Sequence, residues 1–76
     1  MSLTIFNLTH FRCPDTIIML KKKIRNTKKE NIILVLSNDI STKWDIPLFC
    51  TFMKYQLISK KTIYKPYKFL IKKINL

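Results

Sequence analysis

The apolar run from Ile32 to Leu36 places the tightest constraint on how this chain can fold. The run is short and rich in β-branched residues, which favours a strand buried at the centre of a sheet over a helix. A membrane-spanning helix needs roughly 20 consecutive apolar residues. No apolar run in the chain is longer than this one, so no transmembrane segment is expected. The 76 residues leave room for one small domain, which we expect to span residues 1–76.

An amphipathic stretch before this strand predicts a helix that begins at about Pro14, with Cys13 as its N-cap residue. Proline is favoured at the first helical position because its missing N–H would have no partner there. Polar residues 26–31 end the pattern as a turn. The apolar stripe has helical spacing and consists of Ile17, Leu20 and Ile24.

A second helix is predicted after the strand, with two alternative starts. Thr42 and Asp45 have the spacing of a capping box. Pro47 either lies in the first turn of a helix that begins near Asp45 or kinks a longer one that begins at Thr42. The helix presents one buried stripe, which places Cys50 in the core: Ile46, Phe49, Cys50 and Met53.

Three further strands are predicted over residues 3–8, 55–62 and 67–73, and residues 63–66 form the turn of a terminal hairpin. The order of elements is therefore β-α-β-α-β-β. This order predicts an α/β (α+β) two-layer sandwich, in which a four-stranded mixed sheet carries both helices on one face.

The formal net charge of +11 has two interpretations, and the sequence leaves both open. A basic surface of this kind attracts nucleic acid, membrane phosphate or an acidic partner. The chain also contains 13 Lys and 12 Ile but neither Gly nor Ala, a bias that AT-rich codons produce without any selected ligand.

Four aromatic residues lie among the lysines of the predicted hairpin and could stack on RNA bases. Aromatic residues on strands usually pack within the sheet, however, and no RNA-binding consensus accompanies them. Direct tRNA binding is therefore not expected. The four residues are Tyr55, Tyr64, Tyr67 and Phe69.

Cys13 is the strongest candidate for chemistry. A thiol at a helix N-terminus faces backbone N–H groups and the positive end of the helix dipole, which favour a thiolate. Arg12 adds to this effect and Asp15 opposes it. The alternative is a buried, unreactive cysteine. With two cysteines and no secretion signal, both thiols are expected to be free in a cytoplasmic protein.

No metal and no cofactor are expected. The chain offers only His10, Cys13 and Cys50 as soft ligands, whereas a structural zinc site takes four. A chain without glycine also lacks the glycine-rich loops that bind nucleotide phosphates.

Five segments form a distinctive combination: Phe11-Arg12-Cys13-Pro14, Asn38-Asp39, Asp45-Ile46-Pro47, Phe49-Cys50-Thr51-Phe52-Met53 and Pro66-Tyr67-Lys68-Phe69-Leu70-Ile71. Together they resemble the TusA (SirA-like) sulfur-carrier family. The similarity extends from about Leu3 to Lys73, which is nearly the whole chain.

The resemblance implies that Cys13 carries sulfur as a persulfide, with Arg12 and Pro14 in supporting roles. In this family the carrier receives sulfur from a pyridoxal-phosphate cysteine desulfurase of the IscS type and passes it to the TusBCD complex. That relay ends in 2-thiolation of the wobble uridine of tRNA. The implied activity is of the sulfurtransferase type, located in the cytoplasm, and the carrier itself needs no cofactor.

Three positions depart from the family pattern. Thr16 stands where the motif has a second proline, His10 where it usually has a glycine, and Asn7 where it usually has an aspartate. Two alternatives therefore stay open beside an active carrier. One is a degenerate carrier without transfer activity, and the other is a small basic module that binds RNA through the hairpin.

Overall fold

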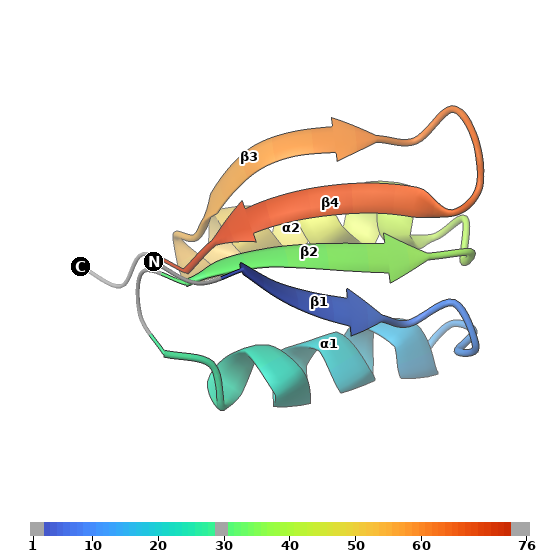
Figure 1. The fold of residues 1–76 in the computed structure, drawn as a ribbon. Helices are drawn as coiled ribbons and strands as arrows, with labels where there is room; N and C mark the ends of the chain where they lie inside the picture. The colour runs from blue at the N-terminus through green and yellow to red at the C-terminus, as the bar shows by residue number, and fades with distance from the viewer. Residues whose placement is uncertain (1–2, 29–30, 74–76) are drawn as a thin grey trace.

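The computed structural model describes residues 3–28 and 31–73 and has the predicted order of elements (Figure 1). The α+β fold class and its β-α-β-α-β-β order are thereby confirmed. The elements are β1 (Leu3–Asn7), α1 (Asp15–Arg25), β2 (Ile32–Ser37), α2 (Thr42–Met53), β3 (Gln56–Lys61) and β4 (Tyr67–Lys72).

The four strands form one mixed sheet in the order β1-β2-β4-β3. β1 and β2 are parallel, because α1 carries the chain back along the sheet between them. β4 is antiparallel to both of its neighbours, β2 and β3. The apolar β2 thus lies in the interior of the sheet, as predicted. Both helices lie on the same face of the sheet (Figure 1).

The core lies between this sheet face and the two helices. Fully burying one aliphatic or aromatic side chain contributes about 1.5–3 kcal/mol, so the interface between the layers is the main source of stability. Met53, which the sequence places in the buried stripe of α2, is 40% exposed because the helix ends there. The buried hydrophobic residues are Leu8, Leu20, Ile24, Ile33, Val35, Ile46, Phe49, Cys50, Tyr67, Phe69 and Ile71.

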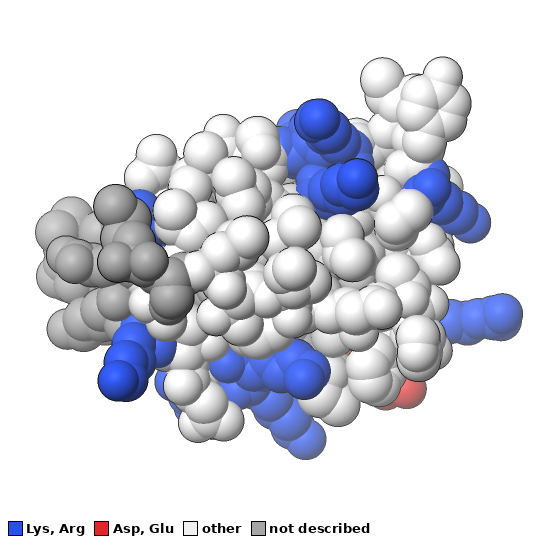
Figure 2. All heavy atoms as spheres, in the orientation of Figure 1, with Lys and Arg blue, Asp and Glu red and all other residues white. Residues whose placement is uncertain are grey.

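Among residues 3–28 and 31–73, no helix covers the opposite face of the sheet, which is largely apolar. Leu3 and Ile5 on β1 are 60% and 58% exposed. Leu34 on β2 and Leu70 on β4 are direct cross-strand neighbours on this face and are half-buried. Figure 2 views the molecule from this side and shows a broad uncharged area with Lys and Arg side chains around it.

The helix starts differ in detail from the sequence-based expectations. Pro14, not Cys13, is the N-cap residue of α1, so Cys13 lies one residue outside the helix. α2 begins at Thr42, the longer of the two alternatives, and includes Pro47. The predicted capping box is wrong, because Ser41 is the N-cap and the Thr42 hydroxyl donates to the carbonyl O of Asp39 at 2.5 Å.

Neither helix in the described ranges is both long enough and apolar enough to cross a bilayer.

Candidate functional site

Cys13 is exposed in a tight turn that leads into α1. At the start of this turn, Leu8 is fully buried in the core. At its end, the backbone N–H groups of Asp15 and Thr16 donate to the carbonyl O of Arg12 at 2.7 and 3.3 Å. The turn is therefore fixed at both ends and presents the thiol to solvent. The alternative of a buried Cys13 is wrong.

The same hydrogen bonds change one expectation about the surroundings of the thiol. An open helix N-terminus would have offered the N–H groups of Asp15 and Thr16 to a thiolate, but both are taken by the carbonyl of Arg12. Arg12 thus closes the first turn of α1 through its backbone, while its side chain is exposed. Pro14 has no N–H of its own to satisfy, which suits it to the N-cap position.

The loop before Cys13 is ordered by side chains at two of the positions that depart from the family pattern. The backbone N–H and the hydroxyl of Thr9 both donate to Oδ1 of Asn7, at 3.1 and 2.7 Å. Thr9 Oγ1 also lies 3.2 Å from Nδ1 of His10. An asparagine turn of this kind shapes a loop by side-chain hydrogen bonds, so the chain builds this loop without a glycine.

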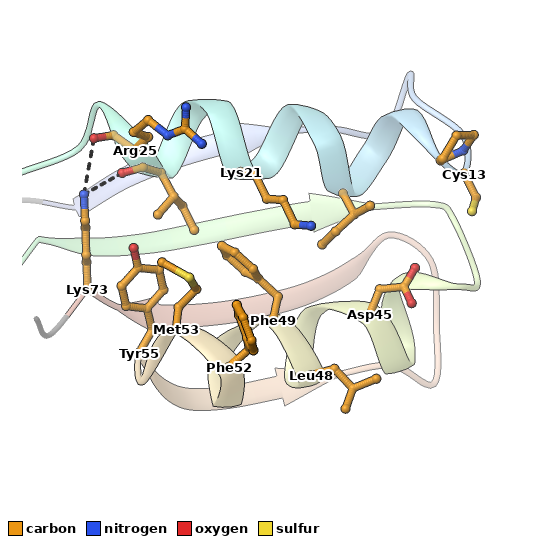
Figure 3. Close-up of a pocket in the computed structure, with 13 residues that line it drawn as sticks. Cys13, Lys21, Arg25, Asp45, Leu48, Phe49, Phe52, Met53, Tyr55 and Lys73 are labelled. Atoms are coloured by element: carbon orange, nitrogen blue, oxygen red, sulfur yellow. Dashed lines mark hydrogen bonds between the residues drawn. The ribbon is translucent and has the colours of Figure 1, made fainter.

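Cys13 lies at one end of a groove between α1 and α2 (Figure 3). The groove has a volume of about 700 Å³. Its α2 wall is apolar, and Leu48 and Phe52 on this wall are 67% and 83% exposed. Its α1 wall carries Lys21 and Arg25. A contiguous apolar surface with polar neighbours is typical of a site where another protein or a ligand docks.

Aromatic contacts hold the floor of the groove in place. The rings of Phe49 and Tyr55 pack edge to face, with centroids 5.7 Å apart and an interplanar angle of 80°. Lys21 Nζ lies 5.9 Å from the centroid of the Phe49 ring, within range of a cation–π interaction. Lys21 is thereby held over the groove instead of extending freely into solvent.

Lys73 closes the far end of the groove. Its side chain is buried, and Nζ donates to the carbonyl O atoms of Ile24 and Thr27, both at 2.8 Å. Nζ also donates to the carbonyl O of Arg25 at 3.4 Å, and Figure 3 draws the bonds to Ile24 and Arg25. These carbonyls belong to the end of α1 and the residues that follow it, where the last carbonyls of a helix lack the N–H partners of a continuing helix. The carbonyl of Ile24 also accepts from the backbone N–H of Thr27 at 3.0 Å. Lys73 therefore stabilises the C-terminal end of α1.

Charge is distributed unevenly along the groove. Asp45, which is half-buried on α2, lies toward the Cys13 end. Lys21, Arg25 and Lys73 follow along the α1 side and at the far end (Figure 3). An apolar segment with acidic side chains complements the central part of this groove.

Cys50 has no part in this surface. It is only 2% exposed, and burial raises the pKa of its thiol from 9.0 to about 11. The thiol stays protonated at neutral pH and is a poor nucleophile, since the thiolate is the reactive form. The prediction that Cys50 is a core residue is confirmed.

Several residues of the groove were not found by sequence reasoning. Lys21 and Arg25 were assigned only to the polar face of a helix, and Phe52 lies outside the predicted stripe of α2. Lys73 contacts a carbonyl 49 positions away in the sequence. No local pattern signals such a contact, because it exists only when β4 packs beside the end of α1.

Within the described part of the chain, no three His, Cys, Asp or Glu side chains come together in a group that could hold a metal ion.

The structure defines the chain as a small α+β domain that holds an exposed thiol in a fixed turn at the end of a groove between its two helices. The family model for sulfurtransferase TusA matches residues 4–73, and the chain belongs to this family. The protein is therefore a sulfur carrier of the sulfurtransferase type.

Proposed function

We propose that Cys13 accepts sulfur from a pyridoxal-phosphate cysteine desulfurase of the IscS type and holds it as a persulfide. The loaded carrier then passes the sulfur to the TusBCD complex, in a cytoplasmic relay that ends in 2-thiolation of the tRNA wobble uridine. The observation that carries this proposal is the contrast between the two thiols. Cys13 is exposed at the end of a groove, whereas Cys50 is buried.

The proposed transfer is a thiol exchange in which atoms and electrons balance. The Cys13 thiolate attacks the terminal sulfur of the donor's persulfide, and a new S–S bond forms between this sulfur and Cys13 Sγ. The donor's S–S bond breaks, and its electron pair leaves on the donor cysteine. The proton released by the Cys13 thiol is matched by the proton that the donor thiolate takes up. Delivery to the acceptor repeats the same step with Cys13 as the leaving group.

The residues next to Cys13 have supporting roles in this proposal. Pro14 starts α1 directly after the reactive residue, and the carbonyl of Arg12 closes the first turn. Both hold the backbone of Cys13 in place, so that the attacking sulfur does not have to be ordered during the encounter with a partner. Arg12, the residue before Cys13, has an exposed side chain and contributes a positive charge to this turn.

The groove supplies a docking site for the partners. It has an exposed apolar wall at Leu48 and Phe52 and a cationic wall at Lys21 and Arg25, and Cys13 lies at one of its ends (Figure 3). A partner that lays an apolar segment with acidic side chains into the groove brings its own cysteine close to Cys13. This arrangement favours partners with an acidic surface around their reactive cysteine.

The experiment that tests this proposal is intact-mass analysis after incubation with a cysteine desulfurase and cysteine. The wild type and Cys50→Ser should each gain about 32 Da per bound sulfur atom, reversible by a thiol reductant, and Cys13→Ser should gain nothing. A gain on Cys13→Ser would assign the sulfur to another residue and overturn the proposal. No gain on any variant, with the desulfurase active on a second acceptor, would identify a degenerate carrier.

The later relay step needs its own measurement. Carrier loaded with ³⁵S should transfer the label to purified TusBCD, and the label should leave the carrier in equal amount. Retention of the label on the carrier, with TusBCD shown to accept sulfur from another donor, would contradict the proposed acceptor but not the loading of Cys13.

A further inference from the structure

The turn between β3 and β4 carries a second surface that sulfur transfer does not use. Its two central residues, Ile63 and Tyr64, are 83% and 84% exposed. The turn and the adjacent strand ends surround a hollow of about 590 Å³. In Figure 1 the turn lies at the end of the hairpin, at the β3–β4 edge of the sheet, whereas α1 lies near the opposite edge, which β1 forms. The hollow is lined by Lys60, Lys61, Thr62, Ile63, Tyr64, Lys65, Pro66 and Lys68.

The structure separates the hairpin aromatics into two kinds. Tyr67 and Phe69 are 5% and 0% exposed and belong to the core, and Tyr55 packs against Phe49. For these three the expected role in packing is confirmed. Tyr64 alone among the four presents its ring to solvent, and it does so inside the cluster of lysines that lines the hollow.

The lysines of this turn repel one another. Lys61 on β3 and Lys68 on β4 are direct cross-strand partners, an arrangement that destabilises a sheet when both carry the same charge. The sequence contains no Asp or Glu after Asp45, so no acidic side chain of this half of the chain can offset them. In Figure 2, Lys and Arg side chains gather over the end of β3 and beside the turn. An anionic ligand that binds here relieves this repulsion.

We propose that the β3–β4 turn binds single-stranded nucleic acid. Tyr64 stacks on a base, and Lys60, Lys61, Lys65 and Lys68 contact the phosphates on either side of it. Base–aromatic stacking combined with a cationic groove is the general means by which proteins hold single strands. A hollow of this volume accommodates a nucleotide unit, whereas a flat membrane surface would leave the hollow empty. This role is independent of Cys13 and goes beyond the transfer of sulfur.

Fluorescence anisotropy tests the proposal. The probes are labelled oligo(U) and oligo(dT) of about 12 nucleotides, a length within the range that single-strand sites cover. Tyr64→Ala should weaken binding at least about fivefold, while Tyr64→Phe, which keeps the ring, should bind like the wild type. If both oligonucleotides bind with similar affinity, the turn recognises bases and phosphates, which RNA and DNA share. If oligo(U) binds more tightly, the turn prefers RNA. Cys13→Ser should bind like the wild type.

Two double variants that remove the same charge distinguish binding at the turn from general attraction of nucleic acid to a protein of net charge +11. Lys61→Ala/Lys65→Ala should reduce the slope of log K against log salt by about 1.4, because each phosphate contact on a single strand contributes about 0.7. Lys22→Ala/Lys28→Ala removes the same charge near the C-terminal end of α1, away from the turn (Figure 1), and should leave the slope unchanged.

Three results would overturn the proposal. The first is equal loss of affinity in both double variants, which would show nonspecific attraction. The second is binding of duplex DNA of the same length as tightly as the single strands, since stacking on Tyr64 needs an unpaired base. The third is binding to phosphatidylglycerol vesicles without binding to either oligonucleotide, which would assign the turn to a membrane surface. Because Tyr64 is exposed, Tyr64→Ala should unfold at the wild-type temperature, and this control excludes misfolding.

Discussion

At the scale of single residues, two threonines in similar positions have opposite environments. Thr16 and Thr42 both lie in the first turn of a helix and are 1% and 0% exposed. The hydroxyl of Thr42 donates to the carbonyl O of Asp39 at 2.5 Å and lies 3.0 Å from Ser37 Oγ. The hydroxyl of Thr16 is buried without a hydrogen-bond partner among the described residues. Burial without a hydrogen bond makes a hydroxyl destabilising.

Valine has nearly the shape of threonine without its hydroxyl, so it tests this contrast directly. Thr16→Val should raise the free energy of unfolding by about 1 kcal/mol, because it removes an unpaired buried hydroxyl. Thr42→Val should lower it by about 1–2 kcal/mol, because it leaves the Asp39 carbonyl without a donor. Urea denaturation of both variants measures the two effects. Changes of the same sign in both would contradict this account of Thr16.

The buried thiol of Cys50 makes stability depend on pH. Its pKa in the folded protein is about 11, above the ordinary 9.0, so the thiol is protonated in both states below pH 9. Between pH 9 and 11 the unfolded chain loses this proton first, which lowers the free energy of unfolding by about 2–3 kcal/mol. Cys50→Ala should lack this part of the decrease. Urea denaturation at pH 8 to 11 measures the free energy of unfolding of the wild type and of Cys50→Ala. If the two proteins lose the same free energy between pH 9 and 11, the prediction is contradicted.

At the scale of elements, α1 depends on a residue from the other end of the chain. Its first turn is closed locally by the carbonyl of Arg12, and its last carbonyls are held by Lys73. A buried ammonium that donates to several carbonyls satisfies both its own donors and the helix end. Lys73 therefore ties α1 to the sheet and fixes one end of the groove.

Lys73→Met keeps the aliphatic stem and removes the donors. We expect it to lower the free energy of unfolding by about 2–3 kcal/mol, the range for hydrogen bonds to a charged group. Backbone amides in the last turn of α1 should also exchange faster with D₂O. Lys72→Met, one residue earlier and half-buried on the other face of the sheet, should change stability by no more than about 0.5 kcal/mol. Equal effects of the two substitutions would show that Lys73 acts only through its charge.

At the scale of the whole molecule, the groove beside Cys13 belongs to neither helix alone. α1 supplies the cationic wall, α2 supplies the apolar wall, and the sheet holds the two side by side. Cys13 lies where this groove ends, so the proposed docking and the proposed chemistry share one surface. A change of charge on the α1 wall should therefore alter the rate of sulfur loading without touching the thiol.

Lys21→Glu and Lys22→Glu form a matched pair that tests this arrangement. Lys21 lines the groove, whereas Lys22, its neighbour in the sequence, is exposed and does not line it. Lys21→Glu should slow persulfide loading by the desulfurase on the order of tenfold at low salt, because it opposes an acidic partner surface. Lys22→Glu should have little effect. Stopped-time mass analysis measures both rates, and equal slowing would place docking outside the groove.

Much of the fold could be predicted because it depends on local patterns. The β-branched run at Ile32 to Leu36 indicates a strand in the interior of the sheet, and the helical spacing of Leu20 and Ile24 indicates which face of α1 is buried. The structure confirms both predictions. The helix starts depend on contacts from outside each helix. Pro14 became the N-cap, because the Arg12 carbonyl accepts hydrogen bonds from two residues of α1 and closes its first turn from outside the helix.

The sequence by itself determined the order of the elements, the central strand and the membership of Cys50 in the core, because each follows from the periodicity of a short segment. Only the tertiary structure decided that Cys13 lies at the end of a groove, that Lys73 caps α1, and that Tyr64 alone among the hairpin aromatics faces solvent. These features depend on contacts between segments far apart in the chain. Such contacts arise only when the helices and the sheet pack together, and no local pattern specifies them.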